Sequence, residues 1–334
     1  MKKIAIIFVA VVLISGTVTA AEFSKVGTAG AQFLKIGVGA RYHAMGEAAV
    51  ACVDDIYALY WNPAGLTQIT ESELAFTHIS YLADINLNYV AYAKSVEGMG
   101  TFGVAATVLS MDDQEVTTVD QPDGTGDFYS ASSWAVQFSY ARDLTAQFSF
   151  GASFKVIGEK IYREKALGLG FDFGTMLYTG FRSLRLAMNI SNMGPEMQFD
   201  GPDLDVEYED DSSNPNQDPF NSRLKTDPYD LPLLFRIGLA YDFMFSEESR
   251  LMFSMEVRHP NDNLQQGGLG AEFAWKDRYF LRGGYKINYE EEGLGLGGGF
   301  ITGLTESTDL ELDYAWSDFG RFSSVHRFSA SLKF

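Results

Sequence analysis

Alternation of apolar and polar side chains, repeated over many short segments, is the feature that most constrains how this chain can fold. In residues 231–245 every odd position is apolar, whereas the even positions include Arg236, Gly238 and Asp242. Successive side chains of a strand point to opposite faces of a sheet. The pattern therefore predicts strands that have one apolar face and one polar face.

The same pattern predicts fourteen strands. Short links alternate with longer ones, and residues 112–127 and 195–230 are long links. Transmembrane barrels have short periplasmic turns and longer external loops, and this parity predicts that both mature termini lie on the periplasmic side. The predicted strands are 73–81, 85–96, 100–110, 127–142, 145–160, 165–179, 182–192, 231–245, 250–259, 266–276, 278–289, 293–303, 307–317 and 322–334.

These strands predict a closed sheet. Every backbone N–H and C=O must be paired within lipid, so a sheet spans a bilayer only when it closes on itself. The predicted fold class is all-β, a transmembrane antiparallel β-barrel of about 14 strands in residues 73–334, with a long acidic external loop at about 195–230. A soluble sandwich is the alternative, but it gives no reason for alternating link lengths.

The first twenty residues predict a secretory signal peptide. Lys2 and Lys3 precede an apolar run at 4–14, and Val18 and Ala20 suit a cleavage site. The run is too short for a spanning helix, which needs about 20 residues. The predicted location is the cell outer membrane, where the barrel contacts lipid.

The last residues place Phe328, Leu332 and Phe334 on one strand face, and the chain ends in an aromatic residue. A terminal Phe on a last strand is similar to the signal that outer-membrane barrels offer to the barrel-assembly machinery. The alternative is an edge strand that ends in Phe by chance.

The polar face predicts a charged lumen. An eight-strand barrel is just filled by its own side chains, so a fourteen-strand barrel needs further filling. Charges of both signs suggest ion pairs that tie a plug to the wall, with a solvated inner face as the alternative. Ten predicted inward glycines either leave room for a plug or path, or relieve curvature. The predicted lumen charges include Arg236, Asp242, Glu256, Arg258, Glu311 and Asp313.

Residues 21–72 lack the two-residue period and are predicted to fold inside the barrel as a plug of short helices. The stretch 44–53 is rich in helix-forming Ala, Met and Glu. A second short helix is predicted at 56–61, with Asp54 or Asp55 as its cap.

A sharp break is predicted directly after that helix. Asn62 precedes Pro63 and is pushed out of the helical region, yet it can cap the next helix, whose first position Pro63 suits. Ala64 and Gly65 allow a close backbone approach, so the break can turn tightly inside a barrel.

Residues 30–66, GAQFLKIGVGARYHAMGEAAVACVDDIYALYWNPAGL, resemble the amino-terminal signature of the PorV/PorQ family of outer-membrane barrels, which is related to the FadL-type long-chain fatty acid transporters. The resemblance implies a fourteen-strand barrel with a hatch inside it. It maps Asn62, Pro63 and Ala64 onto the Asn-Pro-Ala motif of the hatch, and Tyr60 and Trp61 precede that motif.

Several function classes are disfavoured. A net charge of −19 argues against nucleic acid as a partner. The four histidines lack metal-ligand spacing and no GxSxG occurs, so we expect neither an enzyme nor a cofactor. The acidic stretch 200–218 can hold Ca²⁺, dock a basic partner or simply stay solvated.

Two functions fit the barrel, besides a purely structural role. As a PorV/PorQ-type barrel it would take part in protein export or surface attachment of the type IX secretion kind, with secretion-system subunits or exported cargo as partners. As a FadL-like channel it would take up hydrophobic compounds such as long-chain fatty acids. The polar inner face favours export, although Ile36, Tyr57, Leu59 and Trp61 of the plug can line an apolar pocket.

Overall fold

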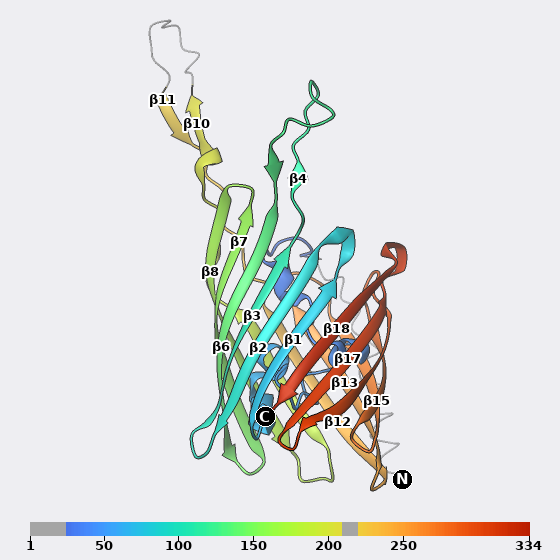
Figure 1. The fold of residues 1–334 in the computed structure, drawn as a ribbon. Helices are drawn as coiled ribbons and strands as arrows, with labels where there is room; N and C mark the ends of the chain where they lie inside the picture. Colours follow the sequence, from blue (N-terminus) through green and yellow to red (C-terminus); the bar gives the residue numbers. More distant parts are fainter. Residues whose placement is uncertain (1–24, 209–219) are drawn as a thin grey trace, which may run out of the picture.

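The computed structural model describes residues 25–208 and 220–334. The predicted signal peptide, residues 1–20, and residues 209–218 of the acidic stretch lie outside the described residues. The chain forms one closed antiparallel barrel of fourteen strands (Figure 1). In chain order these are β1 (Ser72–Ser80), β2 (Asn86–Val96), β3 (Gly100–Ser110), β6 (Ala131–Thr145), β7 (Phe148–Ile161), β8 (Glu164–Tyr178), β9 (Arg185–Met193), β12 (Leu234–Ser246), β13 (Ser249–Pro260), β14 (Gln266–Trp275), β15 (Tyr279–Ile287), β16 (Leu294–Thr305), β17 (Thr308–Asp318) and β18 (Ser324–Lys333).

The predicted fold class is confirmed, and each of the fourteen predicted segments overlaps a barrel strand. Two of the differences lie beside the long loops. The segment predicted at 127–142 begins its barrel strand at Ala131, and the one predicted at 231–245 begins at Leu234. Leu231 is instead buried, and Pro232, which has no N–H to donate to a neighbouring strand, precedes β12.

The first and last strands close the barrel. β1 pairs antiparallel with β18 from Glu73 opposite Lys333 to Ser80 opposite His326. Ser72 and Phe334 extend the seam, because each backbone N–H donates to the other residue's carbonyl over 2.9 Å. The sheet therefore has no free edge along this seam.

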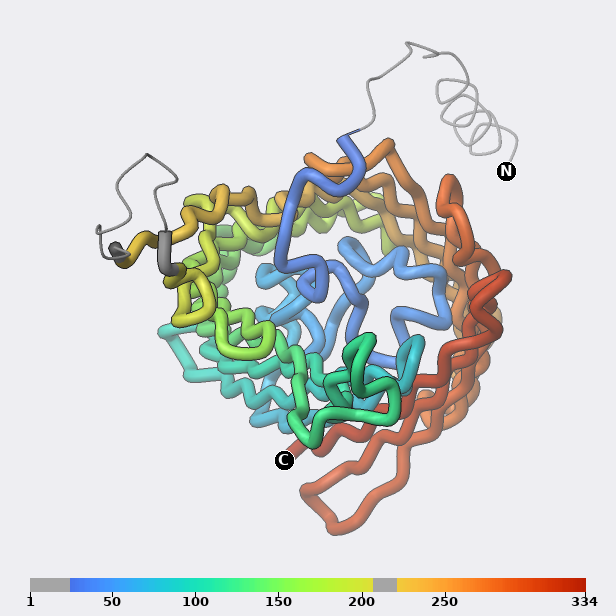
Figure 2. Tube along the Cα trace, turned by 90° about the horizontal axis from the view of Figure 1, so that it is seen from above, coloured from blue at the N-terminus to red at the C-terminus, as the bar shows by residue number. Residues whose placement is uncertain are grey.

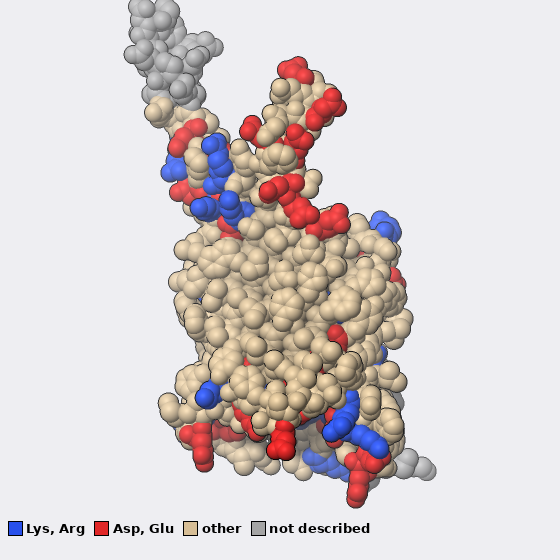
Figure 3. Space-filling model, viewed as in Figure 1, with Lys and Arg blue, Asp and Glu red and all other residues tan. Residues whose placement is uncertain are grey.

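The outer wall is an apolar belt. On the face shown in Figure 3, charged side chains gather at the two ends and are nearly absent from the middle. Outward side chains such as Phe76, Ile237 and Phe253 are exposed. So large an exposed apolar surface fits contact with lipid. No helix among the described residues is long and apolar enough to cross a membrane.

The two ends of the barrel differ. Two hairpins, β4 (Gln114–Glu115) with β5 (Phe128–Tyr129) and β10 (Asp205–Tyr208) with β11 (Phe220–Arg223), stand above one end, which we call the long-loop end (Figure 1). Short turns and the carboxy-terminus lie at the other end, the short-turn end.

Residues 25–71, the inner segment, run through the middle of the barrel (Figure 2). They contain two 3₁₀ helices, η1 (Gln32–Lys35) and η2 (Pro63–Gln68), and two short α-helices, α2 (Ala40–Ala44) and α3 (Ala58–Trp61). The remaining short 3₁₀ helices, η3 (Leu82–Asp84), η4 (Pro202–Leu204) and η5 (Gly320–Phe322), lie in loops of the long-loop end.

The helix predicted over residues 44–53 is wrong. α2 ends at Ala44, and Gly46 and Glu47 have positive φ values of 61° and 58°. Gly46 lies against the backbone of β14 and β15, where a Cβ would meet Tyr285 N at 2.7 Å. This tertiary contact overrides the helix propensity of the surrounding residues.

The predicted mature amino-terminus, residue 21, lies outside the described residues, but the first described residues lie at the long-loop end. Gly30 N–H donates to the carbonyl of Asp230 over 3.0 Å, and Lys35 pairs with Asp262 at 2.8 Å. Both partners belong to the long-loop end, so the described chain begins there, opposite Phe334. Strand parity fixes where β1 starts, but the inner segment crosses the lumen before it.

Replacing Phe253, near the middle of β13, by Arg should lower the free energy of unfolding by about 2–4 kcal/mol because the charge would face the lipid midplane. The matched change Phe245→Arg, beside a short turn, should cost only about 0–1 kcal/mol. Urea unfolding in phospholipid vesicles measures both. Equal losses at the two depths would contradict a lipid-facing wall.

Candidate functional site in the barrel lumen

The inner segment forms the main apolar core of the barrel. Tyr42, Ile56, Leu59 and Trp61 are fully buried, and they pack with inward residues of the wall such as Tyr89. The interior of this barrel is therefore closed by packed side chains at the level of these residues.

Tyr60 and Trp61 lie between the inner segment and the wall. Their rings meet edge to face with centroids 4.9 Å apart, and Trp61 Nε1 donates to the carbonyl of Val38 over 2.9 Å. The guanidinium of Arg236 lies 5.1 Å from the Trp61 ring, and Asn189 of β9 donates to the Trp61 carbonyl over 3.0 Å. A cation over an aromatic face stabilises this contact when it is shielded from water.

Asn62 makes the predicted break between α3 and η2. It is extended, with φ −164°, and its Oδ1 accepts from Ala64 N–H over 3.1 Å while Pro63 begins η2. Its Nδ2 donates to the carbonyls of Val50 and, in strand β8, Thr175, over 2.9 and 3.2 Å. One side chain thus caps a helix and links two parts of the inner segment to the wall.

The cap predicted for α3 takes a different form. The helix starts at Ala58 and its N-cap, Tyr57, has no side-chain bond, whereas Asp55 Oδ1 accepts from Tyr57 N–H over 2.9 Å. Asp55 therefore orders the turn before the helix.

Inward glycines of the wall accept the inner segment at close range. A Cβ on Gly174 would overlap Asn62 Oδ1, and a Cβ on Gly284 would overlap the backbone of Met45 and Gly46. Of the two interpretations of these glycines, the structure supports room for the inner segment at both positions.

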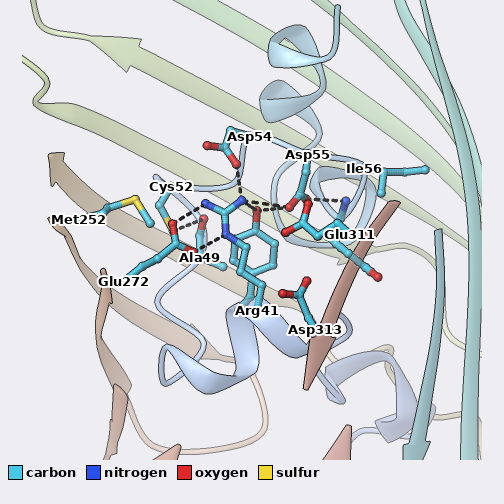
Figure 4. A network of polar contacts seen from close by, with 12 residues as sticks. Arg41, Ala49, Cys52, Asp54, Asp55, Ile56, Met252, Glu272, Glu311 and Asp313 are labelled. Carbon is cyan, nitrogen blue, oxygen red and sulfur yellow. Dashed lines mark hydrogen bonds and ion pairs between the residues drawn. The ribbon is translucent and has the colours of Figure 1, made fainter. Parts of the chain in front are cut away.

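Arg41 is the centre of a buried polar network (Figure 4). Its guanidinium pairs with Asp54 at 2.6 Å, Asp55 at 3.2 Å and Glu272 of β14 at 2.8 Å. Burial alone would raise the pKa of Asp54, but the charges of Arg41 and Arg185 outweigh that effect and lower it to about 2. Asp54 is therefore ionised at neutral pH and holds Arg41 in place.

A second polar cluster lies nearer the long-loop end. Glu47 pairs with Arg258 of β13 at 2.6 Å and with Lys286 of β15 at 2.8 Å. The carboxylate of Glu256 accepts from the backbone N–H groups of Ala49 and Val50 over 2.9 and 2.8 Å. These wall residues hold the inner segment at its tight turn.

The six predicted lumen charges divide into two groups. Arg236, Glu256 and Arg258 contact the inner segment, as the plug-to-wall hypothesis expects. Asp242, Glu311 and Asp313 pair with other wall residues instead. Asp242 is 2.7 Å from Arg185, whereas Glu311 and Asp313 pair with Arg282.

Two buried charged residues of the inner segment, Arg41 and Glu47, were missed by sequence reasoning. Both are charged residues within the small-residue stretch GARYHAMGEAAVACV, and both are buried. A buried charge needs a partner, so charges in such a stretch are a signal that could have identified them.

A lumen cavity of about 400 Å³ lies at the long-loop end, above the packed core. Phe33, Ile36, Leu109 and Leu234 give it an apolar side. Charged residues also line the cavity and give it a polar side: Lys35, Glu47, Arg258, Lys286, Glu292 and Arg327. The lumen cavity can therefore contact both an apolar and a charged part of one molecule.

A larger groove, about 820 Å³, lies on the lipid-facing wall over β14 to β18 and β1. Gly298 and Ala330 have little or no side chain there, and aromatic residues surround the hollow, among them Phe76, Phe273, Trp275, Phe300, Tyr314 and Phe328. Lipid chains can fill such a hollow, so the lumen cavity is the better candidate for a specific site.

His43, Glu47 and Glu292 bring ligand atoms within 4.8 Å of one another. Lys286 Nζ already contacts both carboxylates. Burial, followed by the charges of Arg327 and Lys286, lowers the pKa of His43. The donor set is thus neutralised by an ammonium group and does not fit a metal ion well.

Residues 8–186 match the family described as "Uncharacterised protein family (UPF0164)", which is more than half of the chain. The chain belongs to this family. Among curated proteins no match is found.

Solved structures show the same fold. The chain is similar to the CymD monoaromatic hydrocarbon channel, with 13% identity, TM-score 0.58, and 89% of this chain and 96% of that chain covered. The toluene transporter TbuX of Ralstonia pickettii gives 13% identity and TM-score 0.57 over 89% and 97%. A FadL homologue of Pseudomonas aeruginosa gives 12% and 0.51 over 88% and 96%. This UPF0164 member therefore has a FadL-like barrel, whereas membership of the PorV/PorQ family stays a prediction.

Replacing Arg41 by Ala should lower the free energy of unfolding by about 3–5 kcal/mol, because it leaves buried carboxylates without their partner. The matched change Arg163→Ala, in an exposed pair with Asp203, should cost about 0–1 kcal/mol. Urea unfolding monitored by tryptophan fluorescence measures both. Unfolding midpoints that coincide for the two variants would show that the Arg41 network does not stabilise the fold.

Proposed function

We propose that this protein is a bacterial outer-membrane channel for small hydrophobic compounds and that the inner segment is its gate. The observation that carries the proposal is the lumen cavity at the long-loop end, directly above a lumen closed by packed side chains. A fold similar to those of a hydrocarbon channel and a toluene transporter supports it. These relatives are channels and transporters, which also supports a role without catalysis.

The lumen cavity offers a first binding place for an apolar molecule that arrives from the outside. Phe33 and Ile36 belong to the inner segment, whereas Leu109 and Leu234 belong to the wall. A molecule held between these residues contacts both the inner segment and the wall, so its binding can favour a displaced inner segment.

Passage requires the inner segment to move, because Leu59 and Trp61 leave no exposed path beside them. Ion pairs and hydrogen bonds between the inner segment and the wall must break for this movement. Glu47 would have to leave Arg258 and Lys286, and the turn at Ala49 and Val50 would have to leave Glu256. Each tie is an ion pair or a hydrogen bond to a charge, which can exchange partners in a polar lumen.

Protein export or surface attachment is the second candidate, favoured by the two hairpins above the barrel (Figure 3). The β4–β5 loop carries exposed acidic residues, Asp112, Asp113, Glu115, Asp120 and Asp123, which suit a basic partner. The solved structures support the channel better than this reading. Co-purification of secretion-system subunits or cargo from solubilised outer membrane would support export instead.

The barrel-assembly machinery is a proposed partner. Phe328 and Phe334 are exposed on the outward face of the last strand, and Leu332 between them is partly exposed. An exposed aromatic residue at the carboxy-terminus of a sheet seam is accessible to a recognising protein before the barrel closes.

For the channel, we expect cells that carry the protein in an outer membrane lacking other hydrophobic-compound channels to take up a labelled apolar compound. Leu109→Trp should reduce uptake several-fold, because the larger ring fills the lumen cavity. Leu167→Trp, on the lipid-facing wall, should leave uptake unchanged. Uptake that does not depend on the protein, or that Leu109→Trp leaves at the wild-type rate, would overturn the proposal.

For assembly, Phe334→Ala should lower the fraction of folded protein in the outer membrane, although its backbone bonds to Ser72 can still form. Phe322→Ala, which removes another exposed ring at the long-loop end, serves as the matched control. Heat-dependent gel migration measures the folded fraction. A wild-type folded fraction for Phe334→Ala would remove the assembly role of the ring.

A further inference from the structure

The lipid-facing wall carries a patch of polar side chains at the long-loop end of β2, β1 and β18. These three strands lie side by side in the sheet (Figure 1). Residues that alternate with the patch positions, such as Thr77, Ile79 and Arg327, are buried, so the patch side chains point outward. We call this set the polar wall patch, and it comprises His78, Ser80, Asn86, Asn88, Ser324 and His326.

Members of the polar wall patch bond to neighbouring strands. His78 Nδ1 lies 2.9 Å from Asn88 Oδ1, and His326 Nδ1 lies 2.8 Å from the hydroxyl oxygen of Tyr314. The first bond uses the Asn88 oxygen, so the amide nitrogen of Asn88 can still donate to another molecule. Polar groups that face hydrocarbon without a partner are costly. The patch therefore suits a polar group supplied from the membrane.

The wall beside the polar wall patch is apolar up to the same end. Ile287 of β15 and Leu294 of β16 are exposed there. Neighbouring strands are about 4.8 Å apart, so the three patch strands span about 10 Å. The patch is thus a local interruption of the apolar belt that does not continue onto β15 and β16.

The polar wall patch is continuous with the groove on the lipid-facing wall. His78 lies opposite Phe328, which in turn lies opposite Tyr314, and both aromatic residues line the groove. The ring of Tyr314 also stacks on His326 with centroids 6.1 Å apart. Lipid chains alone can fill the groove, but the patch adds a place for one headgroup. A single lipid can therefore contact both.

The charges near the polar wall patch favour an uncharged headgroup. The loops that join the patch strands to their neighbours, residues 81–85 and 319–323, contain one acid, Asp84, and one base, Arg321, which pairs with Glu291. Within the described residues, neither loop offers a cation free to bind phosphate, which arginine usually binds. Neutral His, Asn and Ser side chains both donate and accept hydrogen bonds, as the hydroxyl groups of a sugar do.

We infer that the groove and the polar wall patch together bind one membrane lipid with an uncharged sugar headgroup. The headgroup would bond to His78 and Asn88, and Trp316, which lies opposite His326 and is partly exposed, offers a ring for stacking. An acyl chain would lie along the groove over Ala330. This lipid belongs to the surrounding bilayer and is not transported, so the inference goes beyond the proposed channel.

The test uses the full mature chain in detergent micelles and measures bound lipid by native mass spectrometry. The probes are glucosyl diacylglycerol, diacylglycerol and phosphatidic acid with the same acyl chains. They separate a sugar headgroup, a single hydroxyl group and an anionic phosphate. The double variant His78→Ala with Asn88→Ala removes headgroup contacts, whereas Ala330→Trp fills the groove.

Two variants elsewhere on the wall are matched controls. His259→Ala removes another exposed histidine, which lies opposite Phe235 at the long-loop end of β13. Ala152→Trp adds an outward ring on β7, opposite Phe173 of β8. Heat-dependent gel migration checks that every variant is folded before binding is measured.

The wild type and both controls should bind one glucosyl diacylglycerol about fivefold or more tightly than either other lipid, because only the sugar bonds to the patch. The double variant should lose this preference and still bind diacylglycerol. Ala330→Trp should weaken the binding of all three lipids several-fold.

Diacylglycerol bound as tightly as the sugar lipid, or phosphatidic acid bound more tightly, overturns the inference. A double variant that keeps the preference, or a control that loses it, overturns the inference as well. Lipid binding to the outer wall is measured without transport, so its failure is distinct from a failure of the uptake experiment.

Discussion

The constraint on which the structure depends is that a sheet in lipid must pair all of its backbone groups. Closing the sheet with fourteen strands satisfies that requirement along the wall, and the seam between Ser72 and Phe334 completes it. The same closure creates an interior that wall side chains alone do not fill. The inner segment fills this interior with its apolar core and is held there by its charged contacts.

The inner segment is apolar where its side chains pack together and charged at several of its contacts with the wall. Trp61 and Leu59 exclude water, whereas Arg41 and Glu47 reach strands more than two hundred residues away in sequence. Replacing buried ion pairs by apolar residues is often neutral or stabilising. Buried ion pairs of this kind therefore fix where the inner segment meets the wall more than they raise the stability of the barrel.

The wall was predictable and the interior only in part. Strands follow from a local two-residue period, and the turn at Asn62 follows from the steric effect of Pro63 on its neighbour. The path around Gly46 was not predictable, because its conformation is set by close contact with β14 and β15. The ion-pair partner of each lumen charge could not be predicted either, because pairing depends on which strand lies opposite in the closed barrel.

The start of the inner segment is joined to the end of the second long loop. Gly30 N–H donates to the Asp230 carbonyl, and the ring of Tyr229 covers Gly30 so closely that a Cβ there would overlap it. Tyr229 in turn exchanges two backbone hydrogen bonds with Met197. A displacement of this loop would therefore act directly on the first turn of the inner segment, because the two share these backbone hydrogen bonds.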